Sequence, residues 1–200
     1  MAEQLVAEDD EEYPVFFYGG KEGEYAEFSQ FARATFTVPH ARIAAVLGRP
    51  VAKVAAIAGP DAATEITFSA AEQFMMYCKA VCFGDAAVAW QILAAATPRE
   101  QKKLGRQVHG FTDEAWDEVK LAVVAAGNAA KFGQSPKRRR LLLGTGTRLL
   151  AEAAPRDRIW GIGFGATNAM LNRDLWGQNL LGKALMMARD ELRQEEAVEG

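Results

Sequence analysis

The pair of side chains best suited to chemistry in this sequence is Glu72 and Lys79, within residues 66–83. Strand-forming residues precede Ser69, a typical N-cap, and the apolar residues after it recur at helical spacing. The pattern therefore predicts the end of a strand followed by a helix from about residue 70. Two turns apart on that helix, the carboxylate and the amine share one face, roughly 10 Å apart along the axis. They could reach two ends of one small ligand.

The same residues also have a purely structural interpretation. Ser69-x-x-Glu72 matches a capping box, in which the glutamate bonds back to the N-cap amide, and Thr97 to Glu100 repeats the pattern. Lys79 would then be a solvated residue at the helix edge. The spacing alone favours this interpretation. Against it, an unpaired charge on an otherwise apolar helix is costly to bury and so marks a candidate site.

The length and composition predict one folded domain. Two hundred residues, half of them apolar, can enclose one sizeable core. The helix count, with three or four short strands, predicts a mainly α fold: a single compact multihelical domain with a small β element, α+β at most. We expect an acidic, disordered tail over 1–12, the folded domain over 13–193 and a flexible tail over 194–200.

Glycine, proline and capping residues mark the expected elements. We predict a short strand over 13–20 and strand or extended loop over 25–38. The expected helices cover 39–48, 50–59, 85–96, 97–105 and 112–133, with a short one from Ser135, and the last begins at Asn179. A strand is expected at 147–153, and a glycine-rich loop follows from Pro155.

The charge distribution points to an anionic small ligand. Outside the two acidic ends, the chain carries 16 acidic and 22 basic residues, which suits a nucleotide. Cys78 and Cys82 lie four apart, and His40 and His109 are isolated, so we expect no metal site and no cofactor. With neither a signal peptide nor a membrane span in the pattern, we expect a cytoplasmic protein.

Several separated motifs resemble the NADAR (YbiA-like) family. They are FYGG and FSQF, then SAAEQFMMYCKA, KFGQ, LLLGTGTRLLAEAAPRD leading to WGIG, and WGQNLLGKALMMARDELR. They run in the family's order from about residue 13 to 193. The resemblance implies a mainly helical fold and hydrolysis of N-glycosidic bonds on ribose phosphates. Members are associated with ribosylamino-pyrimidine intermediates of riboflavin synthesis or with ADP-ribosylated guanine.

The resemblance also implies the site residues. Glu72 and Lys79 match the family's central-helix glutamate and lysine, which reverses the preference for the structural interpretation, and Glu152 falls on an acidic position before the WG motif. The expected substrate-binding residues are Phe16, Tyr18, Gly19, Gln30, Asp157, Trp160, Gly161 and Asn179. The chain departs from the family pattern at Gln30, where asparagine is usual, and in a longer segment over 41–63.

We expect these groups to have different roles in the reaction. As a ribosyl C–N bond breaks, positive charge develops at C1′ and the departing base gains electrons. We predict Glu72 as the acid/base and Lys79 as a nucleophile that forms a Schiff base. Trp160 would stack on a base, with Phe16 and Tyr18 as the opposite wall. Arg106 or Arg148 would neutralise phosphates.

Other interpretations stay open at this point. Asn179 could hold a phosphate or simply cap its helix. The chain could be a non-catalytic ADP-ribose or NAD-binding module. The basic run Lys137 to Arg140 could bind nucleic acid, although such a cluster is more often a solvated face. The oligomeric state and the exact ribosylated target, free or on DNA, are not fixed by the sequence.

Overall fold

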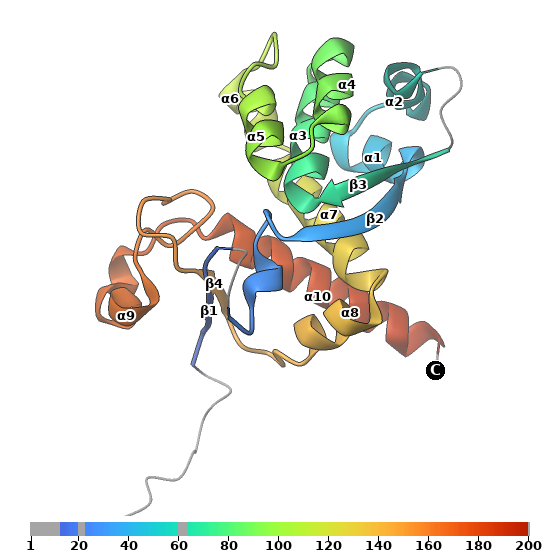
Figure 1. Cartoon of the computed structure of the whole chain (residues 1–200). Coiled ribbons are helices and arrows are strands. Elements are labelled where there is room, and N and C mark those ends of the chain that lie inside the picture. Colours follow the sequence, from blue (N-terminus) through green and yellow to red (C-terminus); the bar gives the residue numbers. More distant parts are fainter. Residues whose placement is uncertain (1–12, 20–22, 60–63, 200) are drawn as a thin grey trace, which may run out of the picture.

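The computed structural model describes residues 13–19, 23–59 and 64–199, and in these residues the fold is mainly helical (Figure 1). The strands are β1 (Val15–Phe17), β2 (Arg33–Pro39), β3 (Glu65–Ala70) and β4 (Leu150–Glu152). The helices are α1 (His40–Leu47), α2 (Val51–Ala58), α3 (Ala71–Cys82), α4 (Ala86–Ala94), α5 (Pro98–Gly105), α6 (Asp113–Asp117), α7 (Lys120–Gly133), α8 (Pro136–Leu143), α9 (Ala166–Ala169) and α10 (Leu180–Glu199), with 3-10 turns η1 (Ala26–Phe28) and η2 (Met170–Leu175). The predicted mainly α fold with a small β element is confirmed. The expected acidic tail lies outside the described residues.

Two small sheets hold distant parts of the chain together. β2 and β3 pair antiparallel, with Phe36 opposite Phe68. β1 and β4 pair parallel, with Val15 opposite Leu150. Parallel strands need a long crossover, and here it contains most of the helices, so the pairing brings the first described strand beside the start of α10 (Figure 1).

The core is built around α3, which is buried on almost every side. Aromatic rings of β2, β3 and α3 pack against one another. Phe68 and Phe74 meet edge to face with centroids 5.1 Å apart, and Phe36 is tilted against both. α7 crosses α3 closely because Gly127 has no side chain. A Cβ there would lie only 2.5 Å from the Phe74 ring. The helix with the predicted reactive pair is therefore the most deeply packed one.

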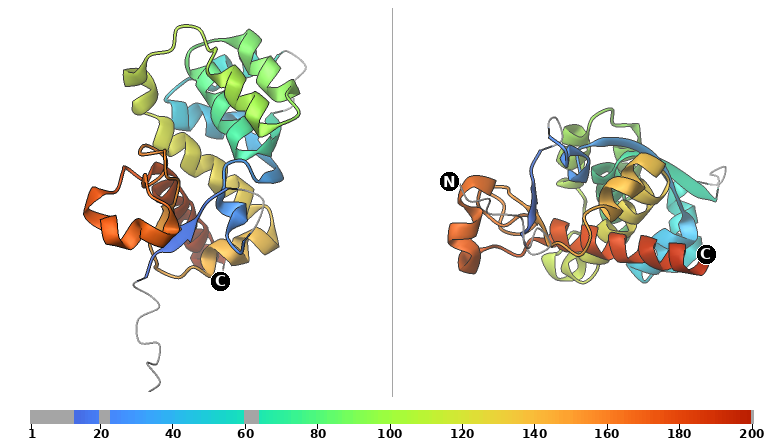
Figure 2. Two further views of the ribbon diagram at one scale, coloured as in Figure 1. Left: turned by 60° about the vertical axis from the view of Figure 1, so that its left-hand side comes forward. Right: turned by 90° about the horizontal axis from the view of Figure 1, so that it is seen from below.

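Most helix boundaries match the sequence patterns, but four features differ. Strand β3 continues through Ala70, so Ser69 is not the N-cap of α3. The helix expected over 112–133 is interrupted between α6 and α7. The region expected to be loop after Pro155 contains α9 and η2, and this segment projects from one side of the molecule (Figure 2).

The fourth difference concerns the end of the chain. α10 continues through Glu199, so the boundary expected at residue 193 falls inside a helix. Arg139 of α8 donates to Glu195 and Glu196 on this last part of α10. Arg138 donates to Glu27 in the same way. Half of the basic run at 137–140 is thus engaged within the molecule.

Candidate active site

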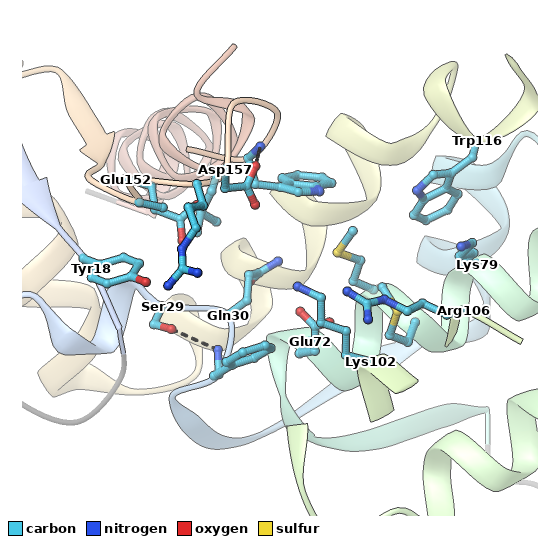
Figure 3. Close-up of a pocket in the computed structure, with 17 residues that line it drawn as sticks. Tyr18, Ser29, Gln30, Glu72, Lys79, Lys102, Arg106, Trp116, Glu152 and Asp157 are labelled. Carbon is cyan, nitrogen blue, oxygen red and sulfur yellow. Dashed lines mark hydrogen bonds between the residues drawn. The ribbon is translucent and has the colours of Figure 1, made fainter. Parts of the chain in front are cut away.

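A cavity of about 470 Å³ opens beside α3. It lies between α3, α5, the turn after η1, the end of β4 and the loop that follows β4, and it contains several of the predicted site residues (Figure 3). Its lining consists of Tyr18, Ser29, Gln30, Phe31, Glu72, Met75, Met76, Lys79, Lys102, Arg106, Trp116, Glu152, Ala154, Arg156, Asp157, Trp160 and Leu181. None of these residues belongs to the longer 41–63 segment. As far as that segment is described, it does not shape this cavity.

Glu72 reaches the cavity from the first turn of α3 and is 4% exposed. Its backbone N–H donates to the carbonyl of Gln30, while its Oε1 is buried and has no hydrogen-bond partner among the described residues. Burial raises the pKa of Glu72 to about 7, against the opposing charges of Lys102 and Arg106. An orphaned carboxyl oxygen in a cavity is unusual in a folded protein.

The capping box proposed for Glu72 is wrong. The residue that folds back on the strand end is Gln73, whose Oε1 accepts from the backbone N–H of Ser69 at 2.7 Å. Gln73 also donates to the carbonyls of Ile92 and Leu93, which ties α3 to α4. Glu72 is therefore not needed to satisfy its own helix terminus.

A second carboxyl group faces the same cavity from the end of β4 (Figure 3). Glu152 has an Oε2 that is buried without a partner in the described part of the chain. Burial raises its pKa to about 7; the charges of Asp157 and Glu72 act in the same direction, and that of Lys102 opposes them. Glu72 and Glu152 are thus electrostatically coupled across the cavity, although they come from opposite ends of the fold.

Lys79 also lines the cavity, but its side chain does not point toward Glu72. Its Nζ lies 3.8 Å from the centroid of the Phe111 ring, and Figure 3 shows the side chain toward Trp116. Burial lowers the pKa of Lys79; Asp113 opposes this, and Arg106 adds to it. A lysine in this environment loses its proton more easily, which a nucleophilic amine requires.

The loop after β4 supplies an aromatic wall. Asp157 accepts from the backbone N–H groups of Ile159 and Trp160 with one oxygen, at 2.9 and 2.8 Å. These bonds fix the turn that presents Trp160 to the cavity. Tyr18 lines the cavity too and is 62% exposed, so it is free to change rotamer around a ligand.

Four of the expected binding residues do not line the cavity. Phe16 packs instead against Trp176, with ring centroids 5.7 Å apart, so the expected wall of Phe16 and Tyr18 consists of Tyr18 alone. Gly19 follows Tyr18 with φ +68 and has open space around it. Gly161 is packed too closely for any side chain, since a Cβ would lie 2.9 Å from the Glu152 carbonyl.

Asn179 is the fourth of these residues, and it joins β4 to the start of α10. Its Nδ2 donates to the Leu150 carbonyl at 2.8 Å, and its Oδ1 accepts from the Glu152 N–H at 3.0 Å. Its φ of +51 is one that asparagine tolerates better than most residues. Because both amide atoms are used within the protein, Asn179 positions Glu152.

The match to a known family decides the identity. Residues 16–193 match the sequence model of the NADAR domain. The chain belongs to the NADAR family. It is 42% identical over 129 residues to the N-glycosidase R617 of Acanthamoeba polyphaga mimivirus, which is 64% of this chain and 76% of that protein. It is 40% identical over 109 residues to an N-glycosidase of Nostoc punctiforme, covering 54% of this chain and 64% of that protein.

A solved structure shows the same fold. The NMR structure of the Escherichia coli protein YbiA superposes with a TM-score of 0.66 at 24% identity, covering 97% of this chain and 93% of that one.

Within residues 13–19, 23–59 and 64–199 no helix is both long and apolar enough to cross a membrane. The same residues hold no group of three His, Cys, Asp or Glu side chains that could bind a metal ion.

Sequence analysis of this NADAR chain missed part of the cavity lining. Lys102, Trp116 and Arg156 were not singled out, and Arg106 was only one of two arginines considered. One signal for two of them was present, because Lys102 and Arg106 are four residues apart on a helix and must share a face. Which neighbour that face would meet depends on tertiary packing.

Proposed function

We propose that this NADAR protein is an N-glycosidase, a hydrolase that cleaves the C–N glycosidic bond of a ribose-phosphate or ADP-ribosyl substrate. The relatives named N-glycosidase support this activity. The single structural observation that carries it is the orphaned, buried oxygen of Glu72, which faces a cavity opposite Glu152. Such an oxygen is ready to accept a hydrogen bond or a proton from a ligand.

Glu72 is proposed as the proton-transfer group. With a pKa raised to about 7, its carboxyl group can both donate and accept a proton near neutral pH. It would protonate the departing base as the C1′–N bond breaks. Glu152, the second carboxyl, would stabilise the positive charge that develops at C1′ and the ring oxygen.

Lys79 is proposed as the nucleophile. The sugar ring opens first: the C1′–O4′ bond breaks, O4′ takes the proton of Glu72, and C1′ becomes an iminium carbon joined to the base nitrogen. The neutral amine of Lys79 adds to this carbon, Glu72 carries one amine proton to the base nitrogen, and the C1′–N bond breaks with its electron pair leaving on the base. The Schiff base left on Lys79 adds water at C1′ and a water proton returns to Glu72; the bond between C1′ and the Lys79 nitrogen then breaks, and the sugar leaves as an aldehyde. The lowered pKa of Lys79 favours the addition of its amine.

The remaining cavity residues are proposed to bind and orient the substrate. Tyr18 and Trp160 would stack on the base. The Gln30 Nε2, which is buried without a partner in the described part of the chain, would donate to a ribose hydroxyl. Asp157 and Asn179 would act indirectly, by holding Trp160 and Glu152.

The proposed target is either a small molecule such as a ribosylamino-pyrimidine or an ADP-ribosyl group on guanine. The guanine can be free or part of DNA. We place the reaction in the cytoplasm. The alternative function, a module that binds ADP-ribose or NAD without cleaving it, would use the same cavity. Product formation separates the two functions.

The test combines a product assay with chemical trapping. Native protein is incubated with each substrate type, and released base is measured by chromatography; borohydride is then added and the chain is analysed by mass spectrometry. We expect base release and a sugar adduct on Lys79 that Lys79→Ala abolishes. An adduct that persists in Lys79→Ala overturns the nucleophile assignment. Ligand-dependent thermal stabilisation without any product overturns the enzyme assignment and supports the binding module.

A further inference from the structure

The amine of Lys79 lies on an aromatic ring. Its Nζ is 3.8 Å from the centroid of Phe111, a distance at which a ring face attracts a cation. In the described part of the chain Lys79 forms no ion pair, whereas Lys120 pairs with Asp117. The ring of Phe111 therefore takes the place of a paired acid. We call this arrangement the resting position of Lys79.

The ring is held in place by contacts on both sides of it. Phe111 lies between α5 and α6, and Phe83, which ends α3, meets it edge to face with centroids 5.4 Å apart. Two residues before Phe111, the backbone N–H of His109 donates to Asp85, the N-cap of α4, at 3.0 Å. Thr112, the next residue, caps α6. The ring is thus fixed against the last turn of α3 by residues that do not line the cavity.

The resting position is not one from which Lys79 can react. Figure 3 shows the Lys79 side chain toward Trp116 and away from Glu72. Phe111 itself does not line the cavity. A nucleophilic amine must reach the same carbon whose leaving base takes a proton from Glu72. Lys79 must therefore leave the ring before it forms a bond.

The charge of the amine decides whether it stays on the ring. The ring quadrupole attracts an ammonium group, and a neutral amine lacks this attraction. Burial is the main cause of the lowered pKa of Lys79; Asp113 of α6 opposes it, and Arg106 after α5 adds to it. His109, the other titratable group of this loop, bonds to the residue that caps α4. Loss of the Lys79 proton thus removes the attraction to Phe111.

We propose that Phe111 is a positioning residue for Lys79: its ring holds the protonated amine on the Trp116 side of the cavity, and loss of the proton to water releases the side chain toward the sugar carbon. Lys79 is partly exposed, so water can take the proton while the nitrogen keeps its electron pair. Only the neutral, nucleophilic form then reaches the substrate. This proposal deepens the proposed function and rests on it for the reaction that follows release.

The resting position can be measured by NMR without any substrate. A proton above a ring face is shielded, so with ¹³C-labelled lysine the Hε signals of Lys79, assigned with Lys79→Arg, should lie upfield of those of other lysines at pH 6. They should return to the usual position as the amine loses its proton. Phe111→Leu should lack the upfield shift at every pH, and its Lys79 should titrate at a lower pH. Loss of one cation–π contact favours the neutral amine by about fivefold.

Two further variants serve as controls for this titration. Phe111→Tyr keeps the ring face and should behave as the native protein does. Phe164→Leu removes a ring that lies 6.0 Å from the Arg158 guanidinium carbon, so it should leave the Lys79 titration unchanged.

Either of two results overturns the proposal. An upfield shift that persists after Lys79 has lost its proton would show that the ring holds the neutral amine as well. This measurement needs only the native protein and so does not depend on the folding of a variant. The same Lys79 titration in Phe111→Leu as in the native protein would show that the ring does not stabilise the charge.

Adduct formation separates this proposal from the proposed function. In single turnover with cyanoborohydride, Phe111→Leu should form the Lys79 adduct about fivefold faster than the native protein at pH 6. The two rates should converge at a pH above the measured titration, where the amine is neutral in both proteins. A variant slowed by the same factor at both pH values would show a merely structural role for Phe111 and overturn the proposal. No adduct in any protein, with the native NMR titration as expected, would reject Lys79 as the nucleophile and support the resting position.

Discussion

Two buried charged side chains on neighbouring helices, Lys131 of α7 and Glu72 of α3, make an instructive contrast. They are 1% and 4% exposed, and burial shifts the pKa of each to about 7. Lys131 donates to the carbonyls of Glu27 and Ser29, at 2.6 and 2.9 Å. Glu72 has an oxygen with no partner in the described chain. A displaced pKa alone therefore does not identify a site; at Glu72 it coincides with a missing partner and with a position in the cavity lining.

The two regions are also connected. The backbone segment that Lys131 holds at Glu27 and Ser29 continues into Gln30, whose carbonyl accepts from the Glu72 N–H at 3.0 Å. Lys131 thus stabilises the wall against which Glu72 is placed. One buried charge serves the scaffold, and the other is left available to a ligand.

The largest effect is expected for Glu72→Gln, which tests whether the buried carboxyl of Glu72 takes part in the reaction. The amide keeps the size and the position of the side chain but cannot transfer a proton. We expect the rate of base release to fall by about two to four powers of ten, with unchanged circular dichroism. A variant that retains the native rate would show that Glu72 has no part in the reaction.

The next largest effect is expected for Lys131→Met. Methionine fills a similar volume but donates nothing, so the carbonyls of Glu27 and Ser29 lose their donor. An unsatisfied buried group costs roughly 1 to 3 kcal/mol, which predicts a loss of about 3 kcal/mol in urea unfolding above about pH 10.5, where the lysine is neutral in both states. At pH 7 the loss should be smaller, because Lys131→Met also removes the burial penalty that lowers the pKa of the amine. The exposed residue Lys137 provides the control, since Lys137→Met should change stability by less than about 0.5 kcal/mol.

The pH dependence of stability tests the raised pKa of Glu72. The folded carboxyl of Glu72 binds its proton more tightly than the unfolded one, so native stability falls as pH rises from 4.5 toward 7. Glu72→Gln removes this contribution and leaves that of Glu152, whose pKa is also raised to about 7. At pH 8 the free energy of unfolding of Glu72→Gln should exceed that of the native protein by on the order of 3 kcal/mol. This difference in free energy should disappear at pH 4. A gap that is independent of pH would contradict the raised pKa.

The sequence predicted the elements of this fold well where local chemistry decides them. Asp85, Thr97 and Ser135 each cap the helix expected of them, through bonds to Val88, Glu100 and Arg138. The resemblance to the NADAR family pointed to Glu72 and Lys79, and both side chains line the cavity. Their catalytic roles stay predictions.

The remainder of the site depends on tertiary contacts that local patterns do not contain. A capping-box pattern cannot show that β3 continues past Ser69 or that Gln73 takes the bond assigned to Glu72. Nor can the spacing of Lys102 and Arg106 show that α5 packs on α3, because this depends on Gly105 meeting Met76. Asn179 was placed correctly at the start of a helix, but its amide bonds to β4, far away in sequence.

The pairing of β1 with β4 imposes an order on biosynthesis. Val15 leaves the ribosome early, but its partner Leu150 follows on the order of ten seconds later at usual translation speeds. Until then Tyr18, just after β1, has no strand to anchor it, and Glu152 does not yet exist. The nascent chain can therefore fold α3 with its acidic side chain in place and still be inert, because two of the walls around it are built last.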